Sequence, residues 1–376
     1  MDSMHITQEA HPVSWRQRGR QMAEPPGLVL RTRRLLMHPM RREESDEFYD
    51  AVVSQDSVMR WLAGRRAGTR STAEAMCEQH AAHWARHGYG DFAVRDADTH
   101  EFLGRVGLRN RPAFGVDVGF AINPKAQGRG IASEAGRACL DLAFDALGLP
   151  AVFGFVLPGN EPSVAVLTRL GAQRAGTTIS SGRHCLRFRF DRSCRPARTE
   201  PATYVAGDMR ISYSAGPIRP ELRAMLADGY PDLASLTAPG LTRAAEEHTL
   251  TANHEGKPVA CVGWSLRDMT YDGLTRRVAA LGGVLVHHEH QGVGTARTLI
   301  SVAIEHARAG DAETALLICP PDMIGFYADL GWNVVPAPVT IRQPDGDQVC
   351  SLGVMTYHIA DVPEPRKYVD MQGSPV

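Results

Sequence analysis

One short pattern occurs twice in this chain, and it constrains the fold more than any other feature. Residues 127–132 read Gln-Gly-Arg-Gly-Ile-Ala, and residues 291–296 read Gln-Gly-Val-Gly-Thr-Ala. Each copy follows an apolar or alternating segment typical of a strand and precedes a helical pattern. Glycine permits backbone conformations closed to other residues, so successive N–H groups can point at one anion beside the positive end of a helix dipole. The pattern therefore predicts two strand, turn and helix units, each able to hold a pyrophosphate.

A single glycine turn before a helix is a weak signal, because it can also be a plain tight connection. Here it recurs in matching surroundings, which favours a repeated ligand site. At 376 residues the chain is also long enough for two hydrophobic cores. A polar, proline-bearing stretch near residue 200 is the best linker candidate. The expected divisions are a disordered arm at 1–26, an N-terminal domain at 27–192, a linker at 193–206, a C-terminal domain at 207–361 and a flexible tail at 362–376.

Composition excludes several classes of partner. The formal net charge is -1, which gives no general attraction to nucleic acid or an anionic membrane. No apolar run approaches the roughly 18 residues needed to span a bilayer. The seven cysteines show no Cys-x-x-Cys spacing and no disulfide framework, which indicates free thiols in a reducing compartment. We expect a cytoplasmic monomer or homodimer without nucleic-acid or membrane partners.

The two units show a similar order of predicted elements. In the first unit we expect strands at 28–40, 91–94, 102–108, 116–122, 151–156 and 183–191, and helices at 43–53, 72–87, 131–146 and 162–170. In the second unit we expect strands at 209–213, 258–266, 277–286 and 315–319, a closing hairpin of 333–341 with 348–359, and helices at 220–229, 242–253, 299–307 and 322–330.

The repeated Gln-x-x-Gly-x-Ala pattern resembles the acetyl-CoA pyrophosphate loop of the GNAT superfamily of N-acetyltransferases. The resemblance covers about residues 28–192 and 207–360. It implies an α+β (three-layer α/β) architecture of two tandem GNAT folds, each a mixed, mostly antiparallel sheet with helices on both faces. It also implies acetyl-CoA (coenzyme A) as the cofactor and an amine as the acceptor.

By matching positions, the resemblance assigns cofactor-binding roles to the strand ends, to both glycine loops and to one asparagine. These residues are Phe120, Ile122, Gln127, Gly128, Arg129, Gly130, Ile131, Ala132 and Asn160 in the first unit, and Val284, Val286, Gln291, Gly292, Val293, Gly294, Thr295 and Ala296 in the second. The strand residues would contribute backbone groups, so the identity of their side chains matters little.

The strongest catalytic candidate is a tyrosine in the second unit. Residues 326–332 read Phe-Tyr-Ala-Asp-Leu-Gly-Trp, which resembles the family segment whose tyrosine commonly protonates the departing CoA thiolate. The resemblance gives that role to Tyr327. The alternative is a half-buried tyrosine that only packs a helix end.

The first unit carries a different segment at the equivalent place. Residues 159–163 read Gly-Asn-Glu-Pro-Ser, similar to ribosomal-protein alanine acetyltransferases. That likeness places Asn160 on the pantetheine arm and Ser163 near its sulfur, where a serine could act only through water. The glutamate usual in that subfamily is replaced by Ala175, which disfavours peptide acetylation.

A general base is harder to assign. Asp117 lies on a predicted strand, where a solvated or cross-strand-paired carboxylate is an equal alternative. His288, beside the second loop, is another candidate, against a polar loop without function. The neighbouring histidines lack convergent spacing, so we expect no metal. The second unit looks most like aminoglycoside 2'-N-acetyltransferases, but their glutamate is replaced here by Gly282.

Three functions follow from these patterns. The leading hypothesis is acetyl-CoA-dependent N-acetylation of a small-molecule amine, such as an aminoglycoside-like or other antibiotic or natural-product acceptor, in resistance or biosynthesis. A second is acetylation of a protein N-terminus or peptide amine by the first unit. A third is a non-catalytic acyl-CoA-binding protein.

Overall fold

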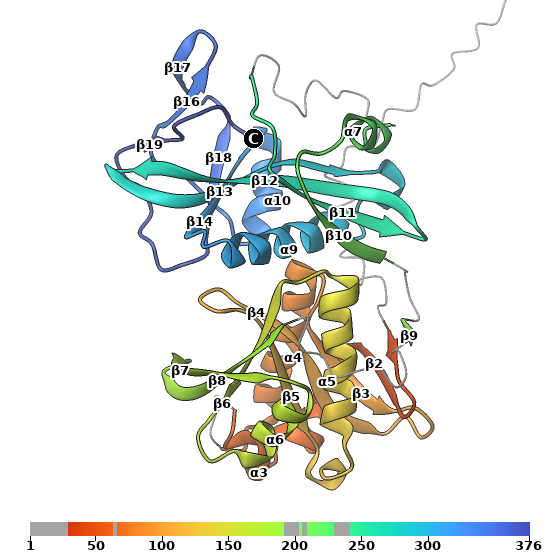
Figure 1. The fold of residues 1–376 in the computed structure, drawn as a ribbon. Coiled ribbons are helices and arrows are strands. Elements are labelled where there is room, and N and C mark those ends of the chain that lie inside the picture. Colours follow the sequence, from red (N-terminus) through yellow and green to blue (C-terminus); the bar gives the residue numbers. More distant parts are fainter. Residues whose placement is uncertain (1–28, 63–65, 192–202, 205–208, 229–240) are drawn as a thin grey trace, which may run out of the picture.

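The structure is a computed structural model that describes residues 29–62, 66–191, 203–204, 209–228 and 241–376. The arm expected at 1–26 and most of the linker expected at 193–206 lie outside these residues. The described chain forms two sheet-bearing units that stack on one another (Figure 1).

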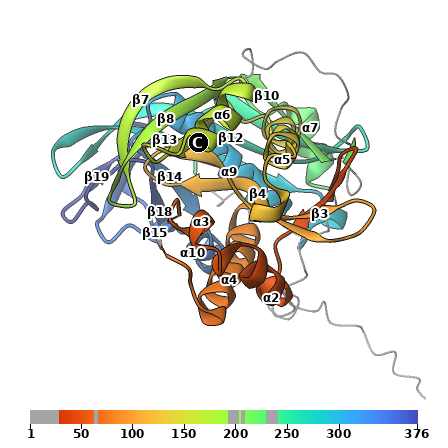
Figure 2. The ribbon, with the colours of Figure 1, turned by 90° about the horizontal axis from the view of Figure 1, so that it is seen from below.

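The first unit is built on a nine-stranded sheet with the order β7-β8-β6-β5-β4-β3-β2-β1-β9. Its strands are β1 (Leu30–Arg31), β2 (Leu35–Pro39), β3 (Asp91–Asp96), β4 (Phe102–Arg111), β5 (Gly115–Ile122), β6 (Ala151–Val156), β7 (Gln173–Ser180), β8 (Arg183–Asp191) and β9 (Thr203–Tyr204). Its main helices are α2 (Ser45–Phe48), α3 (Asp56–Met59), α4 (Arg70–His87), α5 (Ile131–Asp141) and α6 (Glu161–Arg169). Viewed from below, α5 lies on one side of β3 and β4, and α2 and α4 lie on the other (Figure 2). The sheet therefore has helices on both faces.

The second unit repeats this plan on a ten-stranded sheet. Its strands are β10 (Met209–Ala215), β11 (His248–His254), β12 (Lys257–Tyr271), β13 (Leu274–Val286), β14 (Thr314–Cys319), β15 (Asn333–Val334), β16 (Val339–Gln343), β17 (Gly346–Val349), β18 (Gly353–His358) and β19 (Val369–Asp370). Its helices are α7 (Pro220–Leu226), α9 (Thr295–Ala309) and α10 (Ile324–Asp329). Among its described residues, two strand pairings are parallel, β13 with β14 and β16 with β19, and the others are antiparallel. Both units thus have the mixed, mostly antiparallel sheets expected from the sequence.

Several expectations about individual segments are wrong. Residues 242–253 were expected to form a helix, but β11 occupies 248–254 and pairs with both β10 and β12. Polar and apolar residues alternate along 248–254 as in an inner strand. Pairing with β10 and β12 outweighs the helical pattern of this segment. Within the expected linker, β9 adds to the first sheet beside β1.

The expected flexible tail at 362–376 is instead packed on the second sheet. β19 pairs with β12, and the side chains of Val369, Met371 and Val376 are buried. The backbone N–H of Met371 donates to the Thr340 carbonyl oxygen at 3.0 Å. Apolar residues spaced two apart explain this packing, since they place a continuous row on one face of an extended segment.

The two units share one core. Helix α9 runs along the underside of the second sheet and faces α4 of the first unit (Figure 1). The His87 ring and the Ser301 hydroxyl lie 3.1 Å apart, and Asn110 donates to the buried Glu305 carboxylate at 3.2 Å. A single hydrophobic cluster includes buried residues of both units. The two units are therefore packed against each other and are not independent domains joined only by a linker.

Buried histidines at this contact predict a loss of stability in acid. His83 accepts a hydrogen bond from the Asn110 N–H at 2.9 Å, so its other nitrogen donates to the Tyr89 carbonyl oxygen. Burial lowers the pKa of His83 to about 4 and lowers that of His87 well below its usual 6.5. Between pH 6.5 and 4 these imidazoles are protonated in the unfolded chain but stay neutral in the folded chain, so the free energy of unfolding falls as the pH falls. His83 alone should contribute about 2–3 kcal/mol at pH 7 that is lost toward pH 4.

Urea unfolding at pH 7.5 and pH 4.5 measures this effect. The matched variant is His83→Gln, whose amide can both donate and accept but does not titrate. We expect a smaller change in unfolding free energy with pH in the variant than in the wild type. An equal change in both proteins would assign the acid sensitivity to other groups.

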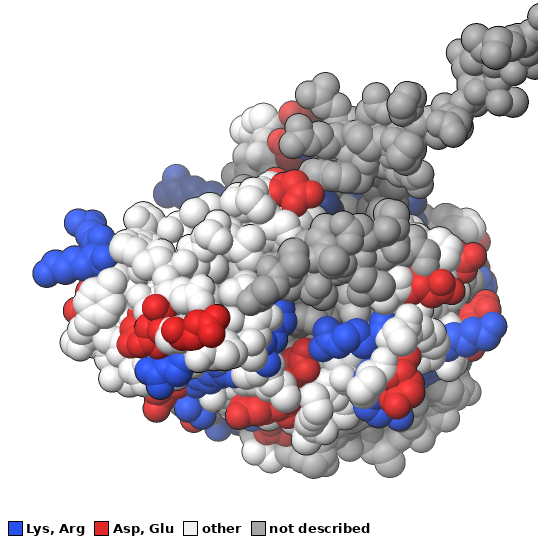
Figure 3. All heavy atoms as spheres, turned by 90° about the horizontal axis from the view of Figure 1, so that it is seen from above, with Lys and Arg blue, Asp and Glu red and all other residues white. Residues whose placement is uncertain are grey.

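The outer surface of the second unit carries charges of both signs. Viewed from above, Lys and Arg side chains alternate with Asp and Glu, and neither sign gathers into a large field (Figure 3). None of the helices in the described ranges is both long and apolar enough to cross a membrane.

Candidate active sites

Both glycine loops have the same local structure. A short 3-10 turn follows the strand in each unit, at Pro124–Ala126 (η3) and at His288–His290 (η6). Next, a left-handed glycine forms the N-cap of the following helix, with φ of 79° at Gly130 and 89° at Gly294. Such a φ is strained for any residue with a Cβ, which explains the glycines at these positions.

The glutamine of each loop fixes the loop to the strand that precedes it. The Gln127 side-chain amide donates to the Ile122 carbonyl oxygen at 2.9 Å, and Gln291 donates to the Val286 carbonyl oxygen at 3.3 Å. The equivalent bond in both units shows that the sequence repeat is a structural repeat. Its mechanical role was not visible in the sequence.

Open space lies over both loops. A Cβ added at Gly128, Gly292 or Gly294 would have no neighbour within 4 Å, and one at Gly130 would meet only the Arg34 guanidinium at 3.5 Å. The helices α5 and α9 begin immediately after the loops, so their unpaired N–H groups face this space. Each loop can therefore take an anion.

Arg34 adds a cation to the first loop. Its guanidinium donates to the Arg129 carbonyl oxygen at 3.0 Å and pairs with Glu134 of α5 at 2.7 Å. Thr32 donates to the same carboxylate at 2.5 Å. Burial and these donors together set the pKa of Glu134 below its usual value, although burial alone would raise it. Sequence reasoning missed Arg34 because its partner lies far along the chain.

The sheet of each unit opens directly beside its loop. β5 pairs in parallel with β6 at a single position, Asp117 with Phe153. β13 pairs with β14 only from Val278 to Leu281, although β13 continues to Val286. Beyond these pairs, Phe120 and Ile122 pair only with β4. We call the stretches in which these neighbouring strands no longer pair with each other the first strand divergence (118–122 and 154–156) and the second strand divergence (282–286 and 318–319).

Tyr327 lies close to the second strand divergence. It is on α10, which follows β14, its side chain is 7% exposed, and its hydroxyl is within electrostatic range of Cys319 at the end of β14. Burial, with a smaller contribution from Cys319, raises the pKa of Tyr327 well above its usual value of 10. The hydroxyl therefore stays protonated at neutral pH, as a proton donor requires.

At the same place in the first unit, Asn160 is the N-cap of α6. Its side-chain oxygen accepts a hydrogen bond from the Ser163 N–H at 3.3 Å, and the residue is 9% exposed. This bond gives Asn160 a structural role at the helix start. Ser163 lies in the first turn of the same helix, and the contacts of both residues with the cofactor stay predictions.

Asp117 is held by two arginines. Its carboxylate accepts hydrogen bonds from Arg109 at 2.8 Å and from Arg111 at 2.9 Å, and it is 1% exposed. Arg109 is its partner on β4 across the strand pair. The cross-strand ion pair weighed as the alternative is therefore the arrangement found, and a free base at Asp117 is not.

His288 lies on the η6 turn and is exposed. Its Nδ1 is 3.3 Å from the Asp228 carbonyl oxygen, and its ring lies 4.4 Å from that of His287. These contacts join it to a loop rather than to Tyr327. Within the described part of the chain, no group of three or more His, Cys, Asp or Glu residues is placed to hold a metal ion.

Family models match both units. The Acetyltransferase (GNAT) domain model matches residues 34–173, and the Acetyltransferase (GNAT) family model matches residues 217–332. The chain is a tandem of two GNAT acetyltransferase domains. It is accordingly an acetyl-transferring enzyme by family, with the GNAT fold in each half.

The matches to individual relatives extend over about the length of one GNAT domain. The chain is 26% identical over 153 residues to the uncharacterized N-acetyltransferase YoaA of Bacillus subtilis, a match that covers 39% of this chain and 84% of YoaA. The protein YkkB of the same organism is 26% identical over 156 residues, covering 39% of this chain and 86% of YkkB.

Solved structures give matches of similar extent. An acetyltransferase from Agrobacterium tumefaciens is 23% identical with a TM-score of 0.39, covering 50% of this chain and 100% of that one. RimJ of Mycobacterium smegmatis, solved with CoA-disulfide, is 21% identical with a TM-score of 0.38, covering 45% and 88%.

GNAT acetyltransferases use acetyl-CoA, and both loops fit its diphosphate. The fit rests on two left-handed glycines per loop with open space above them and a helix N-terminus behind. Bound there, the cofactor supplies an acetyl group activated as a thioester. The loops offer N–H donors to it, and in the second domain the Tyr327 hydroxyl lies near the second strand divergence.

A glutamate that sequence reasoning missed lies beside the second strand divergence. Glu246, just before β11, is 7% exposed and pairs with Arg223 of α7 at 2.6 Å. A Cβ added at Gly283 of β13 would lie 3.0 Å from its Oε1. The signal was hidden because residues 242–253 carry a helical pattern, which placed Glu246 inside a helix rather than at the start of a strand.

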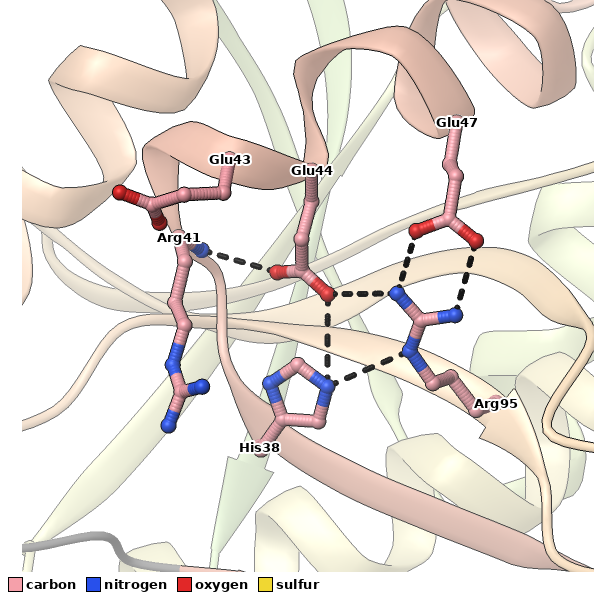
Figure 4. A pocket seen from close by; sticks show the side chains of 6 residues that line it. All are labelled: His38, Arg41, Glu43, Glu44, Glu47 and Arg95. Carbon is pink, nitrogen blue, oxygen red and sulfur yellow. Dashed lines mark hydrogen bonds and ion pairs between the residues drawn. The ribbon is translucent and has the colours of Figure 1, made fainter.

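A hollow of about 420 Å³ in the first domain is a separate feature. It is lined by residues from β2, β3 and the first helices, namely His38, Arg41, Glu43, Glu44, Glu47 and Arg95 (Figure 4). Arg95 pairs with both Glu44 and Glu47. None of the lining residues belongs to a glycine loop or a strand divergence.

Proposed function

We propose that the second GNAT domain transfers the acetyl group of acetyl-CoA to the amine of a small molecule, with Tyr327 as the acid. The observation that carries this proposal is a buried tyrosine of raised pKa beside the place where β13 and β14 part. A departing thiolate there needs a proton, and Tyr327 holds one at neutral pH.

For the acceptor, we infer an aminoglycoside-like or other antibiotic-like amine. Support comes from the sequence likeness of residues 277–357 to aminoglycoside 2'-N-acetyltransferases. A buried carboxylate on the α7 side of the sheet, that of Glu246, suits a cationic acceptor.

The first domain supports a second candidate, acetylation of a protein N-terminus or peptide amine. Its support is the Asn160 and Ser163 pair at the start of α6 and the complete glycine loop beside Arg34. The replacement of the subfamily's glutamate by Ala175 argues against it. If the first domain does not acetylate peptides, its remaining role is to bind the cofactor while the second domain carries out the reaction.

An acceptor screen tests the proposal. The purified chain is mixed with acetyl-CoA and either kanamycin, neomycin, spermine or a peptide with N-terminal alanine, and released CoA thiol is measured. We expect turnover with an aminoglycoside that is at least tenfold above that with the peptide. Turnover with the peptide alone would move the activity to the first-domain hypothesis, and cofactor binding without turnover on any amine would favour a non-catalytic protein.

A further inference from the structure

The side chain of Glu246 crosses the second sheet over two glycines, Gly263 and Gly283, whose lack of a side chain leaves room for it. Its backbone is fixed because the backbone N–H of the next residue, Glu247, donates to the Trp264 carbonyl oxygen of β12 at 3.0 Å. From there the side chain crosses β12 at Gly263, where an added Cβ would lie 2.4 Å from the Glu246 Cγ. Any larger residue at position 263 would exclude the glutamate. The glycine at position 263 of β12 is therefore required for the observed conformation of the Glu246 side chain.

The carboxylate ends beside the second strand divergence. Its Oε1 would lie 3.0 Å from a Cβ at Gly283, two residues beyond Leu281, the last β13 residue that pairs with β14. Gly283 has a φ of 61°, and the register of β12 and β13 shifts at this point, so β13 bulges toward the glutamate. The carboxylate therefore faces strand backbone that has no partner on the β14 side.

Glu246 and Tyr327 approach this place from opposite faces of the sheet. Gly283 belongs to the face on which α7 packs, since its added Cβ would also meet Ile218 at 2.4 Å. Tyr327 belongs to the cluster that includes α9 on the other face. An acceptor on the α7 side would meet a carboxylate, and a leaving group on the α9 side would meet a phenol.

The charges around Glu246 are few and identifiable. Arg223 of α7 pairs with it at 2.6 Å and is 38% exposed. Arg243 lies within electrostatic range, although its own guanidinium donates to the Val376 carbonyl oxygen at 2.9 Å. From β12 the facing group is Cys261, whose pKa burial raises to about 12. A buried carboxylate with one half-exposed partner can accept a second cation, such as an ammonium group.

We propose that Glu246 binds the acceptor's ammonium group and takes its proton in the second domain. This proposal rests on the function proposed above and names its base. The ammonium proton passes to the Glu246 carboxylate, directly or through one water. The freed nitrogen pair forms the C–N bond as the C–S bond of the thioester breaks, and the sulfur takes the proton of Tyr327. The second proton of the nitrogen then passes through water to the tyrosinate, so that an amide and a CoA thiol are formed and Glu246 releases its proton to solvent.

The test compares Glu246→Gln with Glu247→Gln, a neighbouring exposed glutamate. Turnover of acetyl-CoA with neomycin is measured from pH 5.5 to 9.5, with acetyl-CoA affinity by calorimetry as a second readout. We expect Glu246→Gln to lower kcat/KM about 100-fold and to lose the acidic limb of the profile, because a general base contributes at least this much. Its acetyl-CoA affinity should stay within twofold, and Glu247→Gln should match the wild type.

A third variant separates chemistry from structure. In Arg223→Met the Glu246 carboxylate remains in place, so turnover with neomycin should stay well above that of Glu246→Gln. If Arg223→Met and Glu246→Gln give the same loss and the same profile, Glu246 is only the partner of Arg223. Wild-type turnover in Glu246→Gln would also overturn the proposal. Wild-type chain that acetylates no amine would instead refute the proposed function.

Discussion

Replacing Tyr327 by phenylalanine is expected to lower turnover by about 10²–10³-fold while leaving acetyl-CoA affinity within twofold. The change deletes one oxygen from a ring that packs against Trp332, with ring centroids 6.1 Å apart. The ring itself stays, so packing is largely kept. The proton for the leaving sulfur is lost, and general acids contribute about 10²–10⁴-fold to rates.

Tyr357→Phe is the matched control. Tyr357 lies on β18, its ring centroid is 5.7 Å from that of Trp332, and burial also raises its pKa. Deleting its hydroxyl should leave kcat within a few-fold of the wild type. Equal losses in the two variants would point to packing, and full turnover in Tyr327→Phe would remove the tyrosine from the chemistry.

Substituting alanine for Gly88 is expected to lower the free energy of unfolding by about 2–4 kcal/mol. Gly88 ends α4 with a φ of 70°, and an added Cβ would lie 1.8 Å from the Thr298 Oγ1 on α9. The left-handed conformation costs an alanine about 1–2 kcal/mol, and overpacking costs about 1–3 kcal/mol more. Because α9 begins at the second glycine loop, its displacement should also weaken acetyl-CoA binding there.

Gly182→Ala isolates the conformational part of this cost. Gly182 also has a φ of 70°, but an added Cβ there would have no neighbour within 4 Å. Thermal and urea unfolding should show about 1–2 kcal/mol for Gly182→Ala. Adding Thr298→Ala to Gly88→Ala should restore part of the loss, because the atom that clashes is removed. Equal costs for Gly88→Ala and Gly182→Ala would show that α4 and α9 do not press on one another.

The sequence was sufficient for the parts of this protein that depend on local pattern. Gln127 and Gln291 each precede glycines with a left-handed φ, a conformation that other residues rarely adopt. The spacing of these glycines alone therefore predicted a turn before a helix. The alternation at 116–122 likewise predicted β5 correctly. Tyr327 was chosen from the motif that its neighbours along the chain carry, and its catalytic role stays a prediction.

Features made by residues far apart in sequence escaped prediction. Glu246 reaches Gly283 only because β11, β12 and β13 align, and the missing side chain at Gly263 has meaning only in that alignment. The burial of the last residues against β12 was equally invisible. In each case a tertiary partner decided the outcome.

Calorimetric titration of acetyl-CoA into the wild type, Gly130→Glu and Gly294→Glu tests the central claim, that the second domain is the working site. Each glutamate would be strained at a left-handed φ and would place a negative charge where the diphosphate binds. The account predicts that Gly294→Glu abolishes both amine acetylation and one binding event, while Gly130→Glu leaves acetylation within a few-fold of the wild type. Loss of acetylation in Gly130→Glu with full activity in Gly294→Glu would contradict it.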